Sequence, residues 1–320
     1  MYKLLTLTKN TFIETVRQPI YIIIILAALF LFIISPSLTM YTMDDDSKLL
    51  RELGLSTLFL TSLFIAIFAA SSALAGEIEN KTVLTVLSKP VQRPTFIISK
   101  FLGVALAVIL AHYICTIAFL MSIRHGVLTR SSDTHDWSVI AAACVVFFVS
   151  FLLSAFFNYV YNWRFASSAI ICLTLLGTMA MVFLGFIDRN FKFNPQGNGF
   201  NSLDVFGAVL LVFAAIIIAA FAIAVSTRFN IVVTLSSCIG LFLLGLISGY
   251  VFGRYAENHI WAKIGYFALP NLQIFWISDA IYEGSVVPVK YIVITACYAI
   301  CYTGAILAFA IALFQKRELD

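Results

Sequence analysis

Long apolar stretches alternate with short polar segments along the whole chain. Eight of them each contain a run of about 20 residues or more without Asp, Glu, Lys or Arg, enough for an α-helix to cross a hydrocarbon core about 30 Å thick. Backbone groups inside lipid must bond within their own segment, so such stretches form helices. The pattern predicts an all-α polytopic membrane protein with about eight transmembrane helices, at residues 20–43, 53–75, 97–123, 138–161, 166–187, 206–226, 230–252 and 291–314.

A ninth apolar segment, residues 264–278, is too short to cross the bilayer. It has Pro270, Asn271 and Gln273 in its middle, where a spanning helix would place apolar side chains. We expect a re-entrant or interfacial helix pair before the last span.

The first 18 residues have the pattern of an amphipathic helix. At about 100° per residue, one side collects polar residues and the other collects apolar ones. The polar side contains Lys3, Asn10, Glu14 and Arg17, and the apolar side contains Leu5, Phe12, Ile13 and Val16. We expect residues 1–18 to form an interfacial helix that ends at Pro19. The alternative is an ordinary cytoplasmic helix end that leads into the first span.

The composition leaves no room for a soluble catalytic domain. Hydrophobic residues make up 62% of the 320 residues and charged residues 11%, against about 45–50% and about 25% in an ordinary soluble domain. No G-x-x-x-x-G-K-[ST] phosphate loop and no catalytic constellation occurs, so any ATP-driven step requires an ATPase on another polypeptide. All six cysteines lie in apolar stretches, which predicts buried free thiols rather than disulfides or a metal site.

Charges are distributed unevenly between the segments that join the spans. With the N-terminus in the cytoplasm, just over half of the Lys and Arg residues, Lys100 among them, lie on the cytoplasmic side and concentrate on short loops. Most acidic residues, including Asp136 and Asp204, then lie outside. Basic short loops favour the cytoplasm, and an even number of spans places both termini there. The net charge of +4 does not indicate a nucleic-acid partner.

One of these cytoplasmic segments, residues 77–90, has the features of a docking helix. Glu77 and Glu79 suit the positive end of a helix dipole, and Pro90 ends the helix. Val83, Leu84, Val86 and Leu87 form an apolar patch with a rim of Glu79, Lys81 and Lys89. Such a patch can receive a soluble partner, or it can pack against its own membrane interface; the residues alone leave both open.

The motif in this region resembles the signature loop of type II ATP-binding-cassette (ABC) exporter permeases. It consists of Glu77-x-Glu79-x-x-Thr82, Leu84, Leu87, Ser88-x-Pro90-x-x-Arg93 and Lys100-x-x-Gly103. The resemblance implies a coupling helix that sits in a cleft of a cytoplasmic ATPase, with Glu77, Glu79, Lys81, Thr82, Leu84, Leu87, Pro90 and Arg93 as coupling residues. Many members have Gly where this chain has Lys81, and members commonly have six spans, so the surplus here is the pair at residues 137–187.

By this resemblance, residues 19–320 form one permease domain in a bacterial cytoplasmic membrane. It implies export of a substrate by two permease copies, as a homodimer or related heterodimer, and two ATPase subunits that bind ATP and Mg²⁺. This chain itself is expected to bind no cofactor and to have no enzymatic activity. The alternatives are an ATP-independent secondary transporter or channel, and a non-transporting membrane anchor for a cytoplasmic ATPase.

Few other residues stand out as candidate sites. His112 is the ionisable candidate inside a span, and it can equally be a neutral histidine bonded to a neighbouring helix; Asn158 similarly suits an interhelical bond. Gly245, Gly249 and Gly253 share a helical face that permits close approach, either between two copies or within one. The cluster His125, Asp133, His135 and Asp136 matches no metal-site spacing and predicts a solvated loop.

Overall fold

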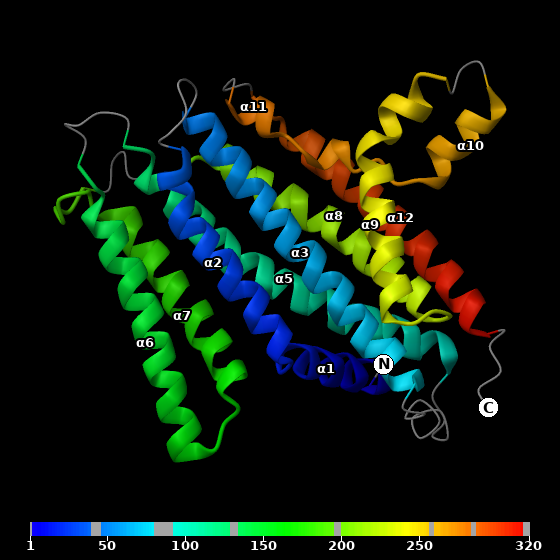
Figure 1. Ribbon diagram of the computed structural model, residues 1–320, viewed down its shortest axis with the longest axis horizontal. Helices are drawn as coiled ribbons and strands as arrows, with labels where there is room; N and C mark the ends of the chain where they lie inside the picture. Colours follow the sequence, from blue (N-terminus) through cyan, green and yellow to red (C-terminus); the bar gives the residue numbers. More distant parts are fainter. Residues whose placement is uncertain are drawn as a thin grey trace.

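The protein was analysed as a computed structural model, which describes residues 2–39, 46–79, 92–128, 134–194, 200–255, 259–282 and 286–315 (Figure 1). Its elements are α1 (Tyr2–Val16), α2 (Pro19–Thr39), α3 (Asp46–Glu79), α5 (Arg93–His125), α6 (Trp137–Tyr161), α7 (Phe165–Phe186), α8 (Ser202–Ser226), α9 (Ile231–Ser248), the π-helical continuation η1 (Gly249–Gly253), α10 (Ile260–Ala268), the 3-10 turn η2 (Gln273–Phe275), α11 (Ser278–Tyr282) and α12 (Val289–Gln315). Within these ranges, extended pairing is limited to one bridge between Ile187 and Phe193.

Eight of these helices are long and apolar enough to cross a membrane: α2, α3, α5, α6, α7, α8, α9 with η1, and α12. The predicted all-α architecture and its eight candidate spans are therefore confirmed. The observed helices differ from the predicted spans mainly in length, since α3 has 34 residues and α5 has 33. At 1.5 Å per residue each is about 50 Å long and extends well beyond a hydrocarbon core of about 30 Å.

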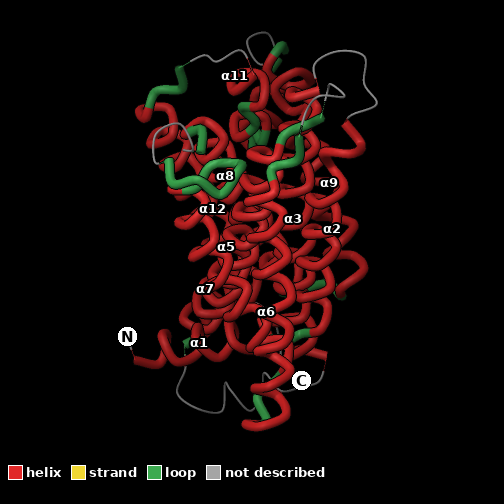
Figure 2. The backbone as a smooth tube through the Cα atoms, turned by 90° about the vertical axis from the view of Figure 1, so that its left-hand side faces the viewer, coloured by secondary structure: helices red, strands yellow, loops and turns green. Residues whose placement is uncertain are grey.

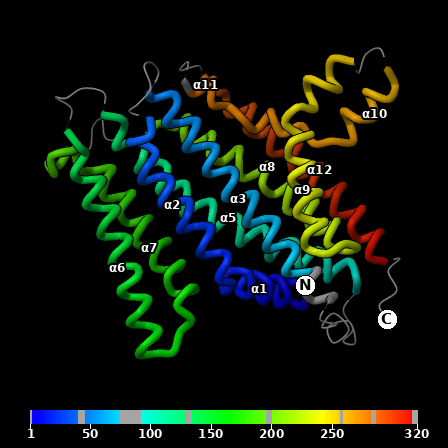
Figure 3. Tube along the Cα trace, in the orientation of Figure 1, coloured from blue at the N-terminus to red at the C-terminus, as the bar shows by residue number. Residues whose placement is uncertain are grey.

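The core lies where α3, α5 and α8 meet. Each of these three spans has 67% of its apolar window buried, whereas the other five have 33% or less. α8 packs against α3, α5 and α12, and its buried face is rich in alanine, which lets helices approach closely. α2 lies against α3 and α5, while α6 and α7 form a hairpin at one side of the bundle (Figures 1 and 3).

The bundle has two distinct ends, which Figure 2 shows from the side. The α1 end holds α1, the start of α5, the α6–α7 turn and the end of α12. The far end holds the end of α5, the start of α6 and α11. α1 and the last turn of α12 share one end, as an even number of spans requires.

α1 is a helix that crosses the base of the bundle (Figure 1), and its packed face matches the predicted one only in part. The buried residues are Thr8, Thr11, Thr15 and Val16, while Leu5 on the expected apolar side is exposed. A row of small threonines packs against α5, and Val16 and Phe12 of the predicted apolar side also pack against the core.

Residues 264–278 form no spanning helix, as expected from their length. α10, η2 and α11 are all short. The Tyr302 hydroxyl donates to the Ala268 carbonyl (2.6 Å), the Tyr291 hydroxyl donates to the Ile274 carbonyl (2.5 Å), and the Asn271 N–H donates to Tyr298 Oη (3.0 Å). Because these tyrosines are spread over the first half of α12, the segment lies along that half of the helix.

Candidate functional site

The predicted coupling segment lies largely outside the described residues: Lys81, Thr82, Leu84, Leu87 and Pro90 fall within residues 80–91. For Glu77 and Glu79, at its start, the structure describes the backbone alone. The expectation that a helix begins at Glu77 is wrong, because α3 continues without a break through Glu79. Both glutamates thus lie in the last turn of a long core helix.

Arg93, the last of the predicted coupling residues, begins α5 and ties that helix to the end of α12. Its Nη1 donates to the carbonyls of Phe314 (3.3 Å) and Gln315 (2.7 Å). Arg228, from the turn after α8, donates from Nη2 to the Leu313 carbonyl (2.8 Å). The last carbonyls of a helix have no partner within it, so these two cations satisfy groups that would otherwise be unpaired.

The next turns of α5 continue this contact. The ring of Phe96 stacks on Phe314 with centroids 5.8 Å apart, and Lys100 Nζ lies 5.7 Å from the Phe96 centroid. Lys100 is buried. The predicted span at residues 97–123 already includes Lys100, and α5 begins four residues earlier, at Arg93, so that Lys100 lies in its third turn.

Gly103 explains how α1 comes so close to α5. A Cβ atom at this position would lie 2.6 Å from the Thr11 Cβ and 2.9 Å from the Thr8 carbonyl oxygen. Real Cβ atoms do not approach other atoms so closely, so any larger residue would displace α1. The glycine of the Lys100-x-x-Gly103 motif is thus a contact point between these two helices.

His112 joins three helices in the core. Its Nδ1 lies 2.7 Å from Ser62 Oγ on α3, and its Nε2 lies 2.8 Å from the Ala208 carbonyl on α8. A carbonyl only accepts, so Nε2 carries the hydrogen and donates. Both ring nitrogens are engaged, which fits the interpretation as a hydrogen-bonded structural histidine.

Asn158 lies at the end of α6 and does not reach another helix. Its Nδ2 donates to the Trp163 carbonyl (2.6 Å), across a turn in which Asn162 has a left-handed φ of 54°. The side chain closes the α6–α7 turn.

The glycine face of α9 and η1 packs within the chain. A Cβ at Gly245 would lie 2.8 Å from Leu272 Cγ and 2.9 Å from the Pro270 carbonyl oxygen. The Leu272 N–H also donates to the Gly245 carbonyl (3.1 Å). Gly249 and Gly253 face Asn271, Gln273 and Tyr266 at ordinary contact distances. This face therefore packs against the segment before α12 within the chain.

A cluster of buried charges at the far end was not predicted. Asp204, in the first turn of α8, is 1% exposed, and its Oδ1 accepts from Arg51 Nε on α3 (3.1 Å). The predicted span at residues 206–226 leaves Asp204 outside the helix, whereas α8 begins at Ser202 and includes it, with Arg51 compensating its charge inside the bundle. Arg51 and Asp204 also line a cavity of about 330 Å³.

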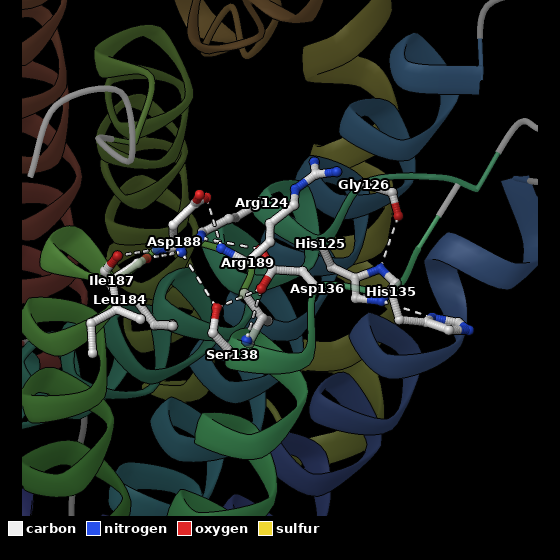
Figure 4. Close-up of polar contacts among 11 residues, drawn as sticks. Arg124, His125, Gly126, His135, Asp136, Ser138, Leu184, Ile187, Asp188 and Arg189 are labelled. Atoms are coloured by element: carbon white, nitrogen blue, oxygen red, sulfur yellow. Dashed lines mark hydrogen bonds and ion pairs between the residues drawn. The ribbon is translucent and has the colours of Figure 1, made fainter. Parts of the chain in front are cut away.

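Asp136 forms the second half of this cluster (Figure 4). It is also 1% exposed, and its carboxylate lies 3.5 Å from Arg124 Nε and 4.0 Å from Arg189 Nε. Its Oδ1 caps α6 by accepting from the Val139 N–H. Arg124 also donates to the Leu184 and Ile187 carbonyls. The predicted solvated loop is therefore wrong here, although a carboxylate just before an apolar stretch is a recognisable capping signal.

The remaining candidate ligands are histidines, carboxylates and cysteines in the described part of the chain. This part contains no group of three His, Cys, Asp or Glu side chains that could hold a metal ion. All six cysteines are free, as predicted, but only Cys115, Cys172 and Cys238 are buried; Cys144, Cys297 and Cys301 are exposed. The exposed three lie on candidate spans, Cys144 on α6 and Cys297 and Cys301 on α12.

Comparison with known proteins gave no assignment: no protein-family model and no curated protein sequence matched the chain. The functional argument therefore rests on the motif and on the geometry described above.

Proposed function

We propose that the chain is the transmembrane permease subunit of an ABC transporter. It would export a substrate across the bacterial cytoplasmic membrane, using ATP hydrolysed by a separate subunit docked on residues 77–93. Two permease copies would assemble with two ATPase subunits, which bind the ATP and Mg²⁺. The basis is the resemblance of residues 77–103 to the signature loop of type II exporters.

The observation that carries this proposal is the connection of residues 80–91 to the core. They join α3 to α5, two of the three most buried spans. On α5, Arg93 donates hydrogen bonds to carbonyls at the end of α12, and Gly103 packs against α1. A partner that moves this segment would therefore displace four helices together. Such a shift requires contacts that differ between the ATP-bound and ATP-free partner, and a docked helix can provide them.

An ATP-independent transporter or channel is the second candidate. It is favoured by the buried Arg51–Asp204 pair, because intramembrane charges often mark ion pathways. Against it, the pair lies in the first turn of α8 rather than at mid-depth, and His112 has both ring nitrogens bonded. A non-transporting anchor for the same ATPase is the third.

Co-purification tests the proposal. The chain is expressed with the ATPase encoded beside it and purified through a tag on the permease. We expect the ATPase to co-purify, and Glu79→Lys to lower both its retention and ATP hydrolysis in liposomes several-fold, because the charge at the docking rim is reversed. Failure of the pair to associate, or full retention and activity with Glu79→Lys, would contradict the coupling role.

The matched control is Asp279→Lys at the far end. Asp279 is exposed and lies 3.6 Å from Lys48, a surface pair that contributes about 0–1 kcal/mol, so its reversal should leave assembly unchanged. Liposome assays then separate the three candidates. Substrate-stimulated ATP hydrolysis indicates the exporter, transport on an ion gradient alone indicates the second candidate, and ATPase binding without stimulation indicates the anchor.

A further inference from the structure

A large apolar groove lies between α2, α5, α6 and α7. Its volume is about 570 Å³, and its walls include Leu29, Ile114, Phe147 and Leu173, one from each helix. Ile33 on the α2 wall and Phe148 on the α6 wall are both exposed, so the groove is open at its side. All four helices are candidate spans, so this side opening faces the lipid.

The groove covers about half the thickness of a bilayer. Its lining runs from Ile114 to His125 on α5 and from Val139 to Phe148 on α6. At 1.5 Å per residue these stretches are about 15 Å long, half of a hydrocarbon core of about 30 Å. The groove therefore reaches from the far end to about the middle of the membrane, which is the depth of one lipid leaflet.

Its polar groups gather at the far end. Ser37, Ser122, His125 and His135 line that end, and the deeper part is lined by apolar residues and Cys144. Trp137, which is exposed, contacts the His135 ring edge-on at 5.8 Å. Tryptophan is enriched where hydrocarbon meets the headgroups, so this end lies at headgroup level.

The two histidines form a short hydrogen-bonded chain (Figure 4). His125 Nδ1 donates to the Gly126 carbonyl (3.0 Å), which leaves its Nε2 to accept from His135 Nδ1 (3.3 Å). His135 Nε2 has no partner among the described residues. An imidazole nitrogen at headgroup level can bond a phosphate oxygen once it carries a proton.

We propose that this groove binds a phospholipid of the far-end leaflet, with one acyl chain between α2 and α6 and the phosphate at the His125–His135 pair. The groove's apolar length and its single polar end match the two parts of such a molecule. Water cannot fill it at this depth without losing hydrogen bonds, whereas an acyl chain loses none. This site is independent of the ATPase docking proposed above.

Photo-crosslinking in membranes tests the site directly. The full chain is reconstituted in phosphatidylethanolamine vesicles with a trace of phosphatidylglycerol that carries a diazirine on one acyl chain. We expect labelling to concentrate on residues 114–122 and 139–148. Labelling spread evenly over the lipid-facing helices α6, α9 and α12 would overturn the proposal.

Two variants fill the groove from different helices, so that one misfolded variant does not end the test. Ala118→Phe on α5 and Ala143→Phe on α6 each add a ring at a half-buried lining position, and we expect groove labelling to fall several-fold. Ala308→Phe adds the same volume at an exposed position of α12 and should leave labelling unchanged. Unchanged labelling in both groove variants would overturn the proposal.

The headgroup and the native cysteines provide two further readouts. A diacylglycerol with the same diazirine chain but no phosphate should label the groove several-fold less, and equal labelling would remove the role of the histidines. Added phospholipid should protect Cys144 from an apolar maleimide in detergent, while Cys297 and Cys301 on α12 react as before. Equal protection of all three would contradict a specific site.

Discussion

Replacing Gly245 by alanine tests a close contact between α9 and the segment before α12. The new methyl group would lie 2.8 Å from Leu272 Cγ and 2.9 Å from the Pro270 carbonyl oxygen. The Leu272 side chain can rotate, but the backbone of this segment cannot easily withdraw. Tyr298 accepts from the Asn271 N–H, and the Leu272 N–H bonds Gly245 itself.

Three effects determine how much Gly245→Ala changes the free energy of unfolding. Overpacking costs about 1–3 kcal/mol, and weakening the bond between the Leu272 N–H and the Gly245 carbonyl costs about 0.5–1.5 kcal/mol. Alanine is favoured over glycine inside a helix by about 1 kcal/mol, which offsets part of this. We expect Gly245→Ala to lower the free energy of unfolding by about 1–3 kcal/mol, with overpacking as the largest contribution.

Gly240 on the same helix is the matched control, because nothing lies within 4 Å of a Cβ built there. Gly240→Ala should therefore gain only the helix preference and stabilise the protein slightly. Both variants are compared by unfolding with SDS in mixed micelles, followed by tryptophan fluorescence. Equal stability of the two alanine variants would refute the close approach. A change in oligomeric state with unchanged stability would instead indicate a contact between copies.

Three further changes probe the other contacts. Gly103→Ala should lower the free energy of unfolding by about 1–3 kcal/mol, because the new methyl group has no room against α1. Asp204→Asn should lower it by about 2 kcal/mol by leaving Arg51 without its carboxylate, and adding Arg51→Met should restore part of the loss in a double-mutant cycle. Arg93→Gln should speed hydrogen exchange of the last turn of α12 without affecting its middle, because two terminal carbonyls lose their donor.

The spans were predictable because lipid imposes a simple rule on them. A helix that must cross about 30 Å of hydrocarbon needs about 20 apolar residues, and the chain contains eight such stretches. That the short segment before α12 does not span the membrane was equally predictable, from Pro270 and its polar neighbours. Hydrophobic pattern fixes these features without reference to any other part of the chain.

Contacts between distant segments were not predictable in this way. Nothing near Asp204 in the sequence indicates Arg51, which lies 153 residues away, so the buried ion pair was not predicted. The same holds for α1, where pattern alone ranks Leu5 above Thr11 as a packed residue. The threonine row packs because α5 presents Gly103 to it, a complementarity that only the folded bundle reveals.

The two ends of the bundle differ in how they can respond to movement. At the α1 end, the close contact at Gly103 joins α5 to α1, and the carbonyl bonds of Arg93 join α5 to α12. At the far end, ion pairs link the helices, and the carboxylate of Asp136 already has two guanidinium groups within 4.0 Å beside a cavity of about 330 Å³. Ion pairs can exchange partners as helices shift. We therefore expect a tilt of α3 and α5 to carry α1 and α12 along as one body and to change separations mainly at the far end. Distances between spin labels on α3 and α8, measured at both ends before and after such a tilt, test this expectation. Equal changes at the two ends would contradict it.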